Sequence, residues 1–413
     1  MRVGFVTQWF PPEPGTFVAK DIAHGLVSRG HEVHVVTGFP NYPTGRLMPG
    51  YRVRPYQQEH PCPGVTVHRA PLVPSHDSRA LPRMVNYLSF AAGATAVVGT
   101  RVPQPDAWLV YSSPATAALP ALAMPTKQAP VTLLIQDLWP DSVTSASFLS
   151  PRAAQLAELA LSPACSAVYR RAAAIGVISP GMRTVLESRG VSPEKIYLTP
   201  NWVSDGHLLP DSQPVHIDRE SLGLPDGLLF VYAGNLGDLQ GLDAVVDAFA
   251  KVPEAQLALV GDGVARTRLE ERAKRAGTEN ITFVPQQPSD RIGAYLAAAD
   301  VQLVSLKDTA LLRVTMPSKV QTALASRRPI LACVAGDAAA LVTEAGAGVS
   351  APPGDVNAMA AAIRHMHNLG RKTLSAMGDA ARQTYLQQYA PAVGIDRLAS
   401  VLETTVTKDA AHE

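Results

Sequence analysis

Short apolar strands alternate with amphipathic helices along this chain, and the alternation begins twice. The opening segment MRVGFVTQWF indicates a buried strand that runs into a loop. Residues 17–30 then follow a helical pattern that Gly30 ends, and HEVHVVTG indicates a second buried strand. A strand, a helix and a strand in this order form a βαβ unit, which predicts a parallel sheet.

The same order of elements starts again after residue 226. Strands are expected at 64–69, 107–111, 131–135 and 174–178 in the first half, and at 228–233, 256–260, 281–284, 301–304 and 330–333 in the second. We therefore expect an α/β chain of two Rossmann-like, doubly wound parallel-sheet domains facing a central cleft. The first should span 1–204 and the second 227–385, with a polar, Pro-rich linker over 205–226.

Charge and cysteine content exclude several classes of protein. The chain has 36 Lys and Arg against 35 Asp and Glu, a net charge of +1, which argues against a nucleic-acid partner. Its three cysteines, Cys62, Cys165 and Cys333, are far apart, which argues against a disulfide framework or a zinc site and fits a reducing cytoplasm.

Residues 85–100 form the longest apolar stretch of the chain. It is shorter than the roughly 20 residues that cross a bilayer. The stretch predicts a buried core helix, and the alternative is a helix that touches a membrane surface beside Arg79, Arg83 and Arg101.

Two loops of the first half carry candidate binding groups. In QWFPPEPGTF, Gly15 and Thr16 stand just before a helix, where free backbone N–H groups favour an anion; the alternative is a Pro-rich turn. In LLIQDLWPDS, Asp137 stands at the end of a strand, where a carboxylate can accept hydrogen bonds from substrate hydroxyls or act as a base. The alternative for Asp137 is a helix N-cap.

Two segments of the second half suit a phosphate. VYAGNLGDLQGLDAVVDAF reads as a strand, a Gly-rich loop and a helix, but it matches neither the P-loop nor the dinucleotide fingerprint. LLRVTMPSKVQTALASRRP places Arg313 and Lys319 on either side of a Pro-Ser turn that opens a helix, where they could hold a diphosphate. Arg327 and Arg328 fit favourable charges at the end of that helix.

Eleven segments in order resemble the GT-B glycosyltransferases of the large retaining family 4, and most closely the WcaI/WbuB-like subgroup. The segments are FVTQWFPPEPG, SRGHEVHVVTGFPNYPTG, IQDLWPDS, AIGVISPGM, EKIYLTPNWVS, VYAGNLGDLQGLD, LVGDG, ITFVPQQP, AADVQLVSL, MPSKVQTALASRRPILA and GAGVSAPPGD.

The resemblance implies an N-terminal domain that binds the acceptor and a C-terminal domain that binds a nucleotide sugar, with 386–413 as a helix packing back toward the N-terminal domain. It implies Asp137, Lys319 and Arg313 as catalytic residues. It implies donor-binding roles for Gly15, Thr16, Gly234, Asn235, Gly237, Gln240, Gly261, Val284, Pro285, Ser318 and Thr322. Backbone groups at Val284 and Pro285 should meet the nucleobase.

The chain departs from the family pattern around the donor. Asn235 and Gln240 stand where many members carry an Arg and a Lys, and Val314 and Thr322 stand where many carry two glutamates spaced E-x7-E. The diphosphate charge should then fall on Lys319, Arg313 and helix N-termini.

The implied reaction transfers a hexosyl or N-acetylhexosaminyl group, with retention, from a UDP-linked sugar to a glycan, lipid-linked or natural-product hydroxyl. No cofactor or metal is expected. The expected location is the cytoplasm, at the inner face of the membrane if a peripheral contact forms. The alternatives are a UDP-sugar 2-epimerase and a nucleotide-sugar-binding partner protein without catalysis.

Overall fold

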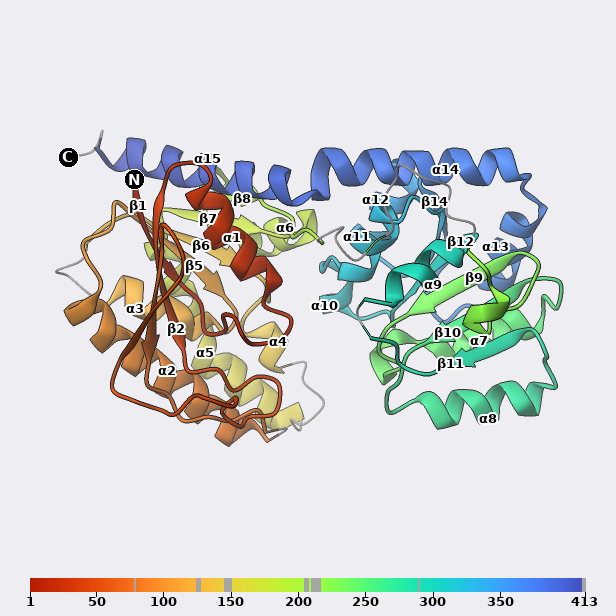
Figure 1. The fold of residues 1–413 in the computed structure, drawn as a ribbon, viewed down its shortest axis with the longest axis horizontal. Helices are drawn as coiled ribbons and strands as arrows, with labels where there is room; N and C mark the ends of the chain where they lie inside the picture. The colour runs from red at the N-terminus through yellow and green to blue at the C-terminus, as the bar shows by residue number, and fades with distance from the viewer. Residues whose placement is uncertain are drawn as a thin grey trace. The chain divides into compact units, whose positions relative to one another are not determined.

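The computed structural model describes residues 1–77, 79–123, 128–144, 151–203, 208, 217–288 and 290–410. The chain divides into two compact units (Figure 1). Unit 1 comprises Met1–Asn201 and Pro391–Glu413, and unit 2 comprises Trp202–Ala390. Each unit has one sheet, parallel except for one edge pair in unit 1, with helices packed on it, so the predicted α/β class with two Rossmann-like domains is confirmed.

The sheet of unit 1 has eight strands in the order β3-β4-β2-β1-β5-β6-β7-β8. All neighbours are parallel except β3 and β4, which form an antiparallel pair at one edge. The strands are β1 (Arg2–Val6), β2 (Glu32–Gly38), β3 (Gln57–Cys62), β4 (Val65–Ala70), β5 (Ala107–Ser112), β6 (Val131–Ile135), β7 (Ala174–Val177) and β8 (Ile196–Leu198). Its main helices are α1 (Phe17–Val27), α2 (Ala80–Arg101), α5 (Pro151–Arg171), α6 (Pro180–Ser188) and α15 (Pro391–Ala410).

The sheet of unit 2 has six parallel strands in the order β11-β10-β9-β12-β13-β14. Numbered along the chain, this is the 3-2-1-4-5-6 order of the doubly wound fold, whose direction of winding reverses between β9 and β12. The strands are β9 (Leu229–Ala233), β10 (Gln256–Val260), β11 (Ile281–Val284), β12 (Val301–Ser305), β13 (Ile330–Cys333) and β14 (Gly348–Ser350). The main helices are α7 (Leu242–Ala250), α8 (Arg266–Ala276), α9 (Ile292–Ala298), α11 (Ser318–Ala325), α12 (Asp337–Glu344), α13 (Val356–Asn368) and α14 (Arg371–Thr384).

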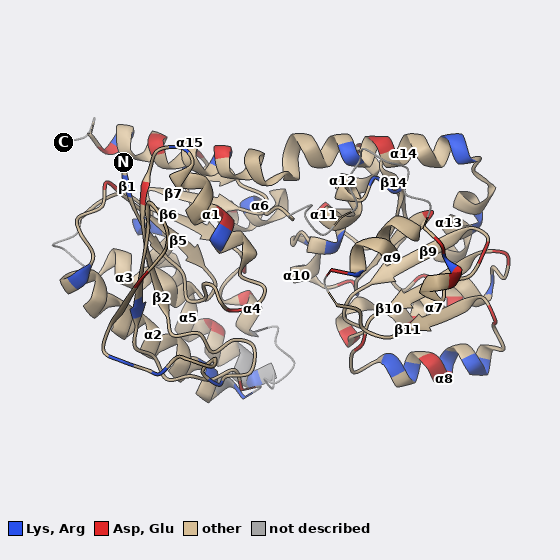
Figure 2. Cartoon of the chain, in the orientation of Figure 1, with Lys and Arg blue, Asp and Glu red and all other residues tan. Residues whose placement is uncertain are grey.

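The apolar stretch at 85–100 lies in helix α2, which has one buried face and one exposed apolar face. Phe90, Ala94 and Val98 are fully buried on one face of the helix, as a core helix requires. The opposite face exposes Leu81 and Leu88, at 75% and 50% of their surface. No charged residue occurs between Arg83 and Arg101 (Figure 2). Within the described part of the chain, no helix is both long and apolar enough to cross a bilayer.

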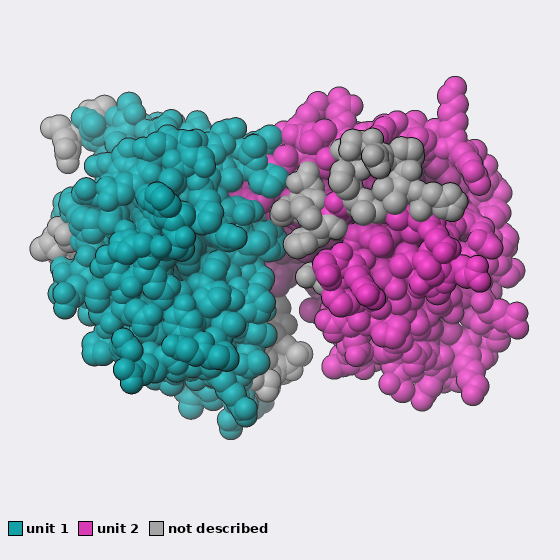
Figure 3. Space-filling model, viewed as in Figure 1, with its two compact units in different colours: residues 1–201, 391–413 teal, residues 202–390 magenta. Residues whose placement is uncertain are grey.

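The boundaries of the units differ from the expected ones (Figure 3). Unit 2 extends to residue 390 rather than 385, because the π-helical turn Tyr385–Tyr389 packs into its core and the Tyr385 hydroxyl donates to the Val203 carbonyl at 2.9 Å. Half of the predicted linker 205–226 lies outside the described residues. Its end is not a linker, since Ile217 and Leu224 pack against the core of unit 2.

Helix α15 belongs to unit 1, although unit 2 precedes it in the sequence. It packs against α1 so closely that a Cβ on Gly25 would lie 2.4 Å from the Ile395 side chain. Ile395, Leu398 and Leu402 bury one face of α15.

A series of contacting polar side chains joins β2, β4 and the start of β3 in unit 1. Strand β3 was not predicted from the sequence, because its residues are polar. The carboxylate of Glu32 accepts from His34 Nε2 at 3.0 Å. His34 Nδ1 is 3.0 Å from His68 Nε2, and His68 Nδ1 is 2.9 Å from the Tyr56 hydroxyl, which itself donates to Gln58 Oε1 at 2.7 Å. Both histidines are buried, and each of their ring nitrogens has a hydrogen-bond partner.

The paired histidines predict a loss of stability in acid. Burial lowers the pKa of His68 to about 4, and the neighbouring His34 and His60 act in the same direction. Burial also lowers the pKa of His34, against the opposing effect of Glu32. Because the unfolded chain binds protons at the ordinary pKa of about 6.5, this stability is present above pH 6.5 and is lost as pH falls toward 4.

We expect His68 to cost about 3 kcal/mol of unfolding free energy between pH 7 and 4. Urea denaturation of the wild-type chain and of His68→Gln at both pH values measures it, since the variant lacks the titrating ring. Equal losses in the two proteins would contradict this account.

Candidate functional site

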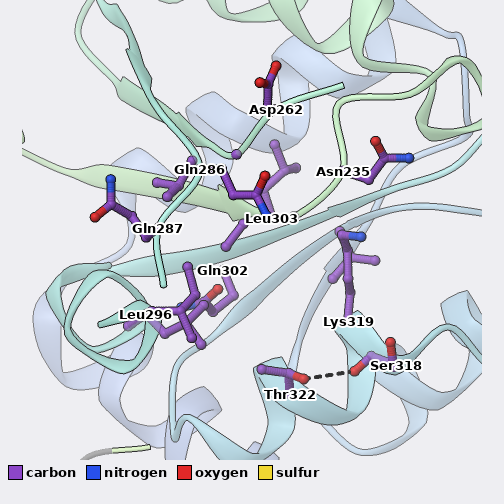
Figure 4. Close-up of a pocket in the computed structure, with 16 residues that line it drawn as sticks. Asn235, Asp262, Gln286, Gln287, Leu296, Gln302, Leu303, Ser318, Lys319 and Thr322 are labelled. Atoms are coloured by element: carbon purple, nitrogen blue, oxygen red, sulfur yellow. Dashed lines mark hydrogen bonds between the residues drawn. The ribbon is translucent and has the colours of Figure 1, made fainter. Parts of the chain in front are cut away.

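A cavity of about 600 Å³ lies in unit 2 at the carboxyl ends of its strands, where β9 and β12 meet (Figure 4). This is the place where doubly wound sheets bind ligands. The residues that line it are Ala233, Gly234, Asn235, Val260, Gly261, Asp262, Gln286, Gln287, Ile292, Leu296, Gln302, Leu303, Val304, Ser318, Lys319 and Thr322. Six predicted residues therefore share one cavity: Gly234, Asn235, Gly261, Ser318, Lys319 and Thr322.

The ammonium group of Lys319 lies over the loop that follows β9. Its Nζ is 2.9 Å from where a Cβ on Gly234 would stand, and 5.2 Å from the centre of the Tyr232 ring. Burial lowers the pKa of Lys319, and no neighbouring charge opposes that effect within the described chain. A half-buried cation without a carboxylate partner is costly, so the cavity favours a bound anion.

Two glycines make room for this arrangement. Gly234 has a φ of +136°, and any side chain there would collide with Lys319. Gly261 has a φ of +146°, and its Cβ would stand 2.0 Å from the Gly234 carbonyl oxygen. The close approach of the loops after β9 and β10 thus depends on glycine at both positions.

The other end of the cavity combines amides with apolar side chains. Figure 4 shows Gln287, Leu296 and Gln302 on the side away from Lys319 and Asn235. Gln302 is buried on β12 and donates to the Leu296 carbonyl at 2.8 Å. Gln286 and Gln287 follow β11 after the single residue Pro285. The sequence reasoning missed these residues, although their position after a strand was a usable signal.

The structure places four of the predicted donor residues of unit 2 outside the cavity lining. Val284 belongs to the core and its carbonyl accepts from Gly261 N–H, so the lining after β11 begins two residues later than expected, past Pro285. Gln240 turns its side chain back onto the loop, where Oε1 accepts from Gly237 N–H at 3.1 Å. Val284, Pro285, Gly237 and Gln240 can thus shape the site but do not line it.

Arg313 also lies outside the lining. Its guanidinium makes two hydrogen bonds to Asp308, at 2.6 and 2.7 Å, and both side chains are exposed. The pair is electrically neutral, whereas Lys319 has no carboxylate partner among the described residues, so the charge that the sequence analysis divided between Arg313 and Lys319 rests on Lys319.

Thr322 lines the cavity one turn beyond Ser318. Its hydroxyl donates to the Ser318 carbonyl at 3.0 Å, so it is engaged within the helix (Figure 4). Thr322 stands where many members of the family carry the second glutamate of the E-x7-E pattern, and its hydroxyl does not supply the negative charge of that glutamate.

The predicted residues of unit 1 lie at the carboxyl ends of its own strands. Gly15 has a φ of +77° and open space around it, and Thr16 opens α1 without a side-chain cap. Asp137 is exposed beyond β6, and its Oδ2 accepts from the Ser113 hydroxyl at 2.8 Å. In the described chain, no group of three or more His, Cys, Asp or Glu side chains could hold a metal ion.

A doubly wound sheet with an unpaired lysine at its switch point is typical of proteins that bind phosphorylated nucleotides. Comparison with protein families gives the particular class. A model described as "Glycosyl transferase 4-like domain" matches residues 15–202, and one described as "Glycosyl transferases group 1" matches residues 227–368. The chain belongs to the GT-B glycosyltransferases of family 4, and it is an enzyme of that class.

Individual relatives agree with this assignment. The chain is 29% identical over 314 residues to WcaI of Escherichia coli, named for colanic acid biosynthesis, covering 74% of this chain and 76% of WcaI. Sucrose-phosphate synthase of Thermosynechococcus elongatus has the same fold, with a TM-score of 0.72, 18% identity and coverage of 99% and 100%. HepE of Anabaena, solved in complex with UDP-glucose, gives a TM-score of 0.66, 17% identity and coverage of 98% and 100%.

Proposed function

We propose that this enzyme transfers a hexosyl or N-acetylhexosaminyl group from a UDP-linked sugar to a hydroxyl group, with retention of the anomeric configuration and without a metal. The observation that carries the proposal is the unpaired ammonium of Lys319 in a cavity between two glycine loops. The complex of HepE with UDP-glucose supports the choice of donor.

Lys319 would neutralise the diphosphate of the donor. As the bond from the anomeric carbon to the diphosphate breaks, negative charge grows on the leaving phosphate. A fixed cation held in a partly buried site stabilises that charge more in the transition state than in the ground state. The N-terminal N–H groups of α11 add to this effect, because Ser318 and Lys319 form its first turn.

The amide end of the cavity would hold the nucleobase. Gln286, Gln287 and Gln302 offer donors and acceptors, while Leu296 and Ile292 supply apolar surface. This mixture suits a flat, polar-edged ring such as uracil.

Asp137 would orient the reacting hydroxyl in unit 1. Its carboxylate is exposed and, among the described residues, forms a hydrogen bond only with the Ser113 hydroxyl, so an oxygen remains available for a substrate hydroxyl. In a front-face reaction the leaving phosphate oxygen can take the acceptor proton, and Asp137 then positions the acceptor.

We also propose a cytoplasmic enzyme that touches the inner membrane surface through α2 and uses a lipid-linked acceptor. The outward side chains Leu81, Val85 and Leu88 are spaced three and four residues apart and so share one face of the helix. Arg83 and Arg101 lie on the opposite side of the helix from this face, and no acidic residue lies on the helix. An exposed apolar face on a helix without acidic residues suits a lipid surface.

Lys319→Ala should weaken UDP binding and lower kcat/KM by at least about tenfold, because one charge-assisted contact is removed. Thermal-shift titration with UDP, GDP and dTDP and with their sugars measures the affinity and identifies the nucleotide. Lys274→Ala, an exposed lysine on α8, is the matched control. Unchanged UDP affinity and unchanged kcat/KM in Lys319→Ala would refute the assignment of the donor site.

Asp137→Asn should lower the transfer rate about 10- to 100-fold while UDP affinity stays at the wild-type value, because the lost charge serves the acceptor. Glu158→Gln, an exposed carboxylate on α5, serves as the control. Full transfer activity of Asp137→Asn would remove this residue from the site.

The membrane contact predicts flotation of the chain with vesicles of phosphatidylethanolamine and phosphatidylglycerol. Replacing Leu81 and Leu88 by serine should reduce the bound fraction about tenfold, since two exposed aliphatic side chains that would enter the lipid surface are lost. Val264→Ser, which alters an exposed apolar residue of unit 2, should have no effect. Absence of the wild-type chain from the floated vesicles would disprove the contact.

A further inference from the structure

Five aromatic rings follow one another across the carboxyl end of the unit 1 sheet, and we call them the aromatic row. Their ring centres are 4.9 Å apart for His76 and Tyr42, 5.7 Å for Tyr42 and Trp9, 6.4 Å for Trp9 and Tyr87, and 6.1 Å for Tyr87 and Trp139. The rings come from the segments after β1, β2, β4 and β6 and from α2. All but Trp139 keep part of their surface accessible.

A buried carboxylate fixes the two loops that carry Trp9 and Tyr42. Glu13 is only 3% exposed and accepts from three backbone N–H groups, those of Phe10, Asn41 and Tyr42, at 3.1, 2.8 and 2.9 Å. Burial raises the pKa of Glu13, against the effect of these hydrogen bonds. Burying a carboxylate is costly, and its result here is a fixed position for two neighbouring rings.

A second buried contact fixes the ring on α2. The Gln8 side chain donates to Asn86 Oδ1 at 2.6 Å, and Asn86 donates to the Val73 carbonyl at 2.7 Å. Gln8 and Asn86 are each 1% exposed and stand beside Trp9 and Tyr87 in the sequence. Buried hydrogen bonds next to the aromatic row, none of which involves the rings themselves, therefore fix the segments that carry Trp9, Tyr42 and Tyr87.

The row passes next to the carboxylate that unit 1 offers to a substrate. Tyr87 packs against Trp139, with ring centres 6.1 Å apart, and Trp139 stands two residues after Asp137 in the segment that follows β6. Asp137 is in turn held by the Ser113 hydroxyl.

We propose that the aromatic row binds a pyranose ring of the acceptor, so that the acceptor is a glycan rather than an aglycone. This rests on the proposed function. A pyranose presents an apolar face of C–H groups and a rim of hydroxyls. The faces of Trp9 and Tyr42 carry the negative side of their quadrupole and suit the C–H face, and Asp137 suits a hydroxyl. A purely aliphatic or aromatic acceptor would use the rings but leave the adjacent carboxylate without a role.

Saturation-transfer NMR on the full chain tests binding of a pyranose, with UDP in excess to occupy the donor site. The probes are methyl β-glucopyranoside and methyl N-acetyl-β-glucosaminide, and sorbitol serves as an acyclic polyol without a ring face. We expect transfer to the ring C–H protons of at least one pyranoside and little to sorbitol.

Trp9→Ala and Tyr42→Ala should each weaken that signal about fivefold or more, while Trp9→Phe, which keeps a ring face, should retain most of it. Tyr197→Ala changes a partly exposed tyrosine on β8 outside the row and should leave the signal unchanged. The thermal midpoint of each variant with UDP shows whether it is folded.

Absence of transfer to either pyranoside, equal transfer to sorbitol, or an unchanged signal in folded Trp9→Ala and Tyr42→Ala would overturn the inference. The proposed donor is tested separately: it would be contradicted if the wild-type chain did not bind UDP. A protein that binds UDP at Lys319 but fails the pyranoside test would therefore keep its donor site and lose only this acceptor assignment.

Discussion

Parallel pairing of the strands is the constraint on which the rest of this molecule depends. Because parallel strands all end at the same edge of a sheet, loops that are far apart in the sequence meet there. In unit 2 this edge brings together the loops after β9 and β10 and the start of α11, and the winding reverses between β9 and β12. In unit 1 the same constraint brings together Trp9, Tyr42 and Asp137, which follow three different strands.

Each edge is built from a different kind of interaction. The edge of unit 2 relies on glycine, because the lack of side chains at Gly234 and Gly261 leaves room for Lys319 and for the close approach of the two loops. The edge of unit 1 relies on buried polar groups, since Glu13 and Gln8 hold the loops beneath the rings. The first arrangement suits a charged ligand that needs close backbone contact, and the second suits a neutral ligand that needs flat surfaces.

Periodicity predicted the strands and helices well because a parallel sheet buries both of its faces and so requires uninterrupted apolar runs. Strand β3 escaped prediction because an edge strand of polar residues has no such run. The residues around Lys319 could be predicted from the Gly-rich loop and the helix start. The pairing of Arg313 with Asp308 could not, because a charge in the sequence does not reveal its partner. Strand β11 ends at Val284 as predicted, but the cavity lining begins two residues beyond it, so the end of a strand does not by itself show which loop residues line a site.

The position of α15 has a consequence for the order in which the protein forms. Domains generally fold as units while the chain is being synthesised, beginning at the N-terminus. Here every residue of unit 2 has been made before α15, whose buried face completes unit 1. Unit 1 starts first and finishes last, so during synthesis all of unit 2 is present before the final helix of unit 1 has been made.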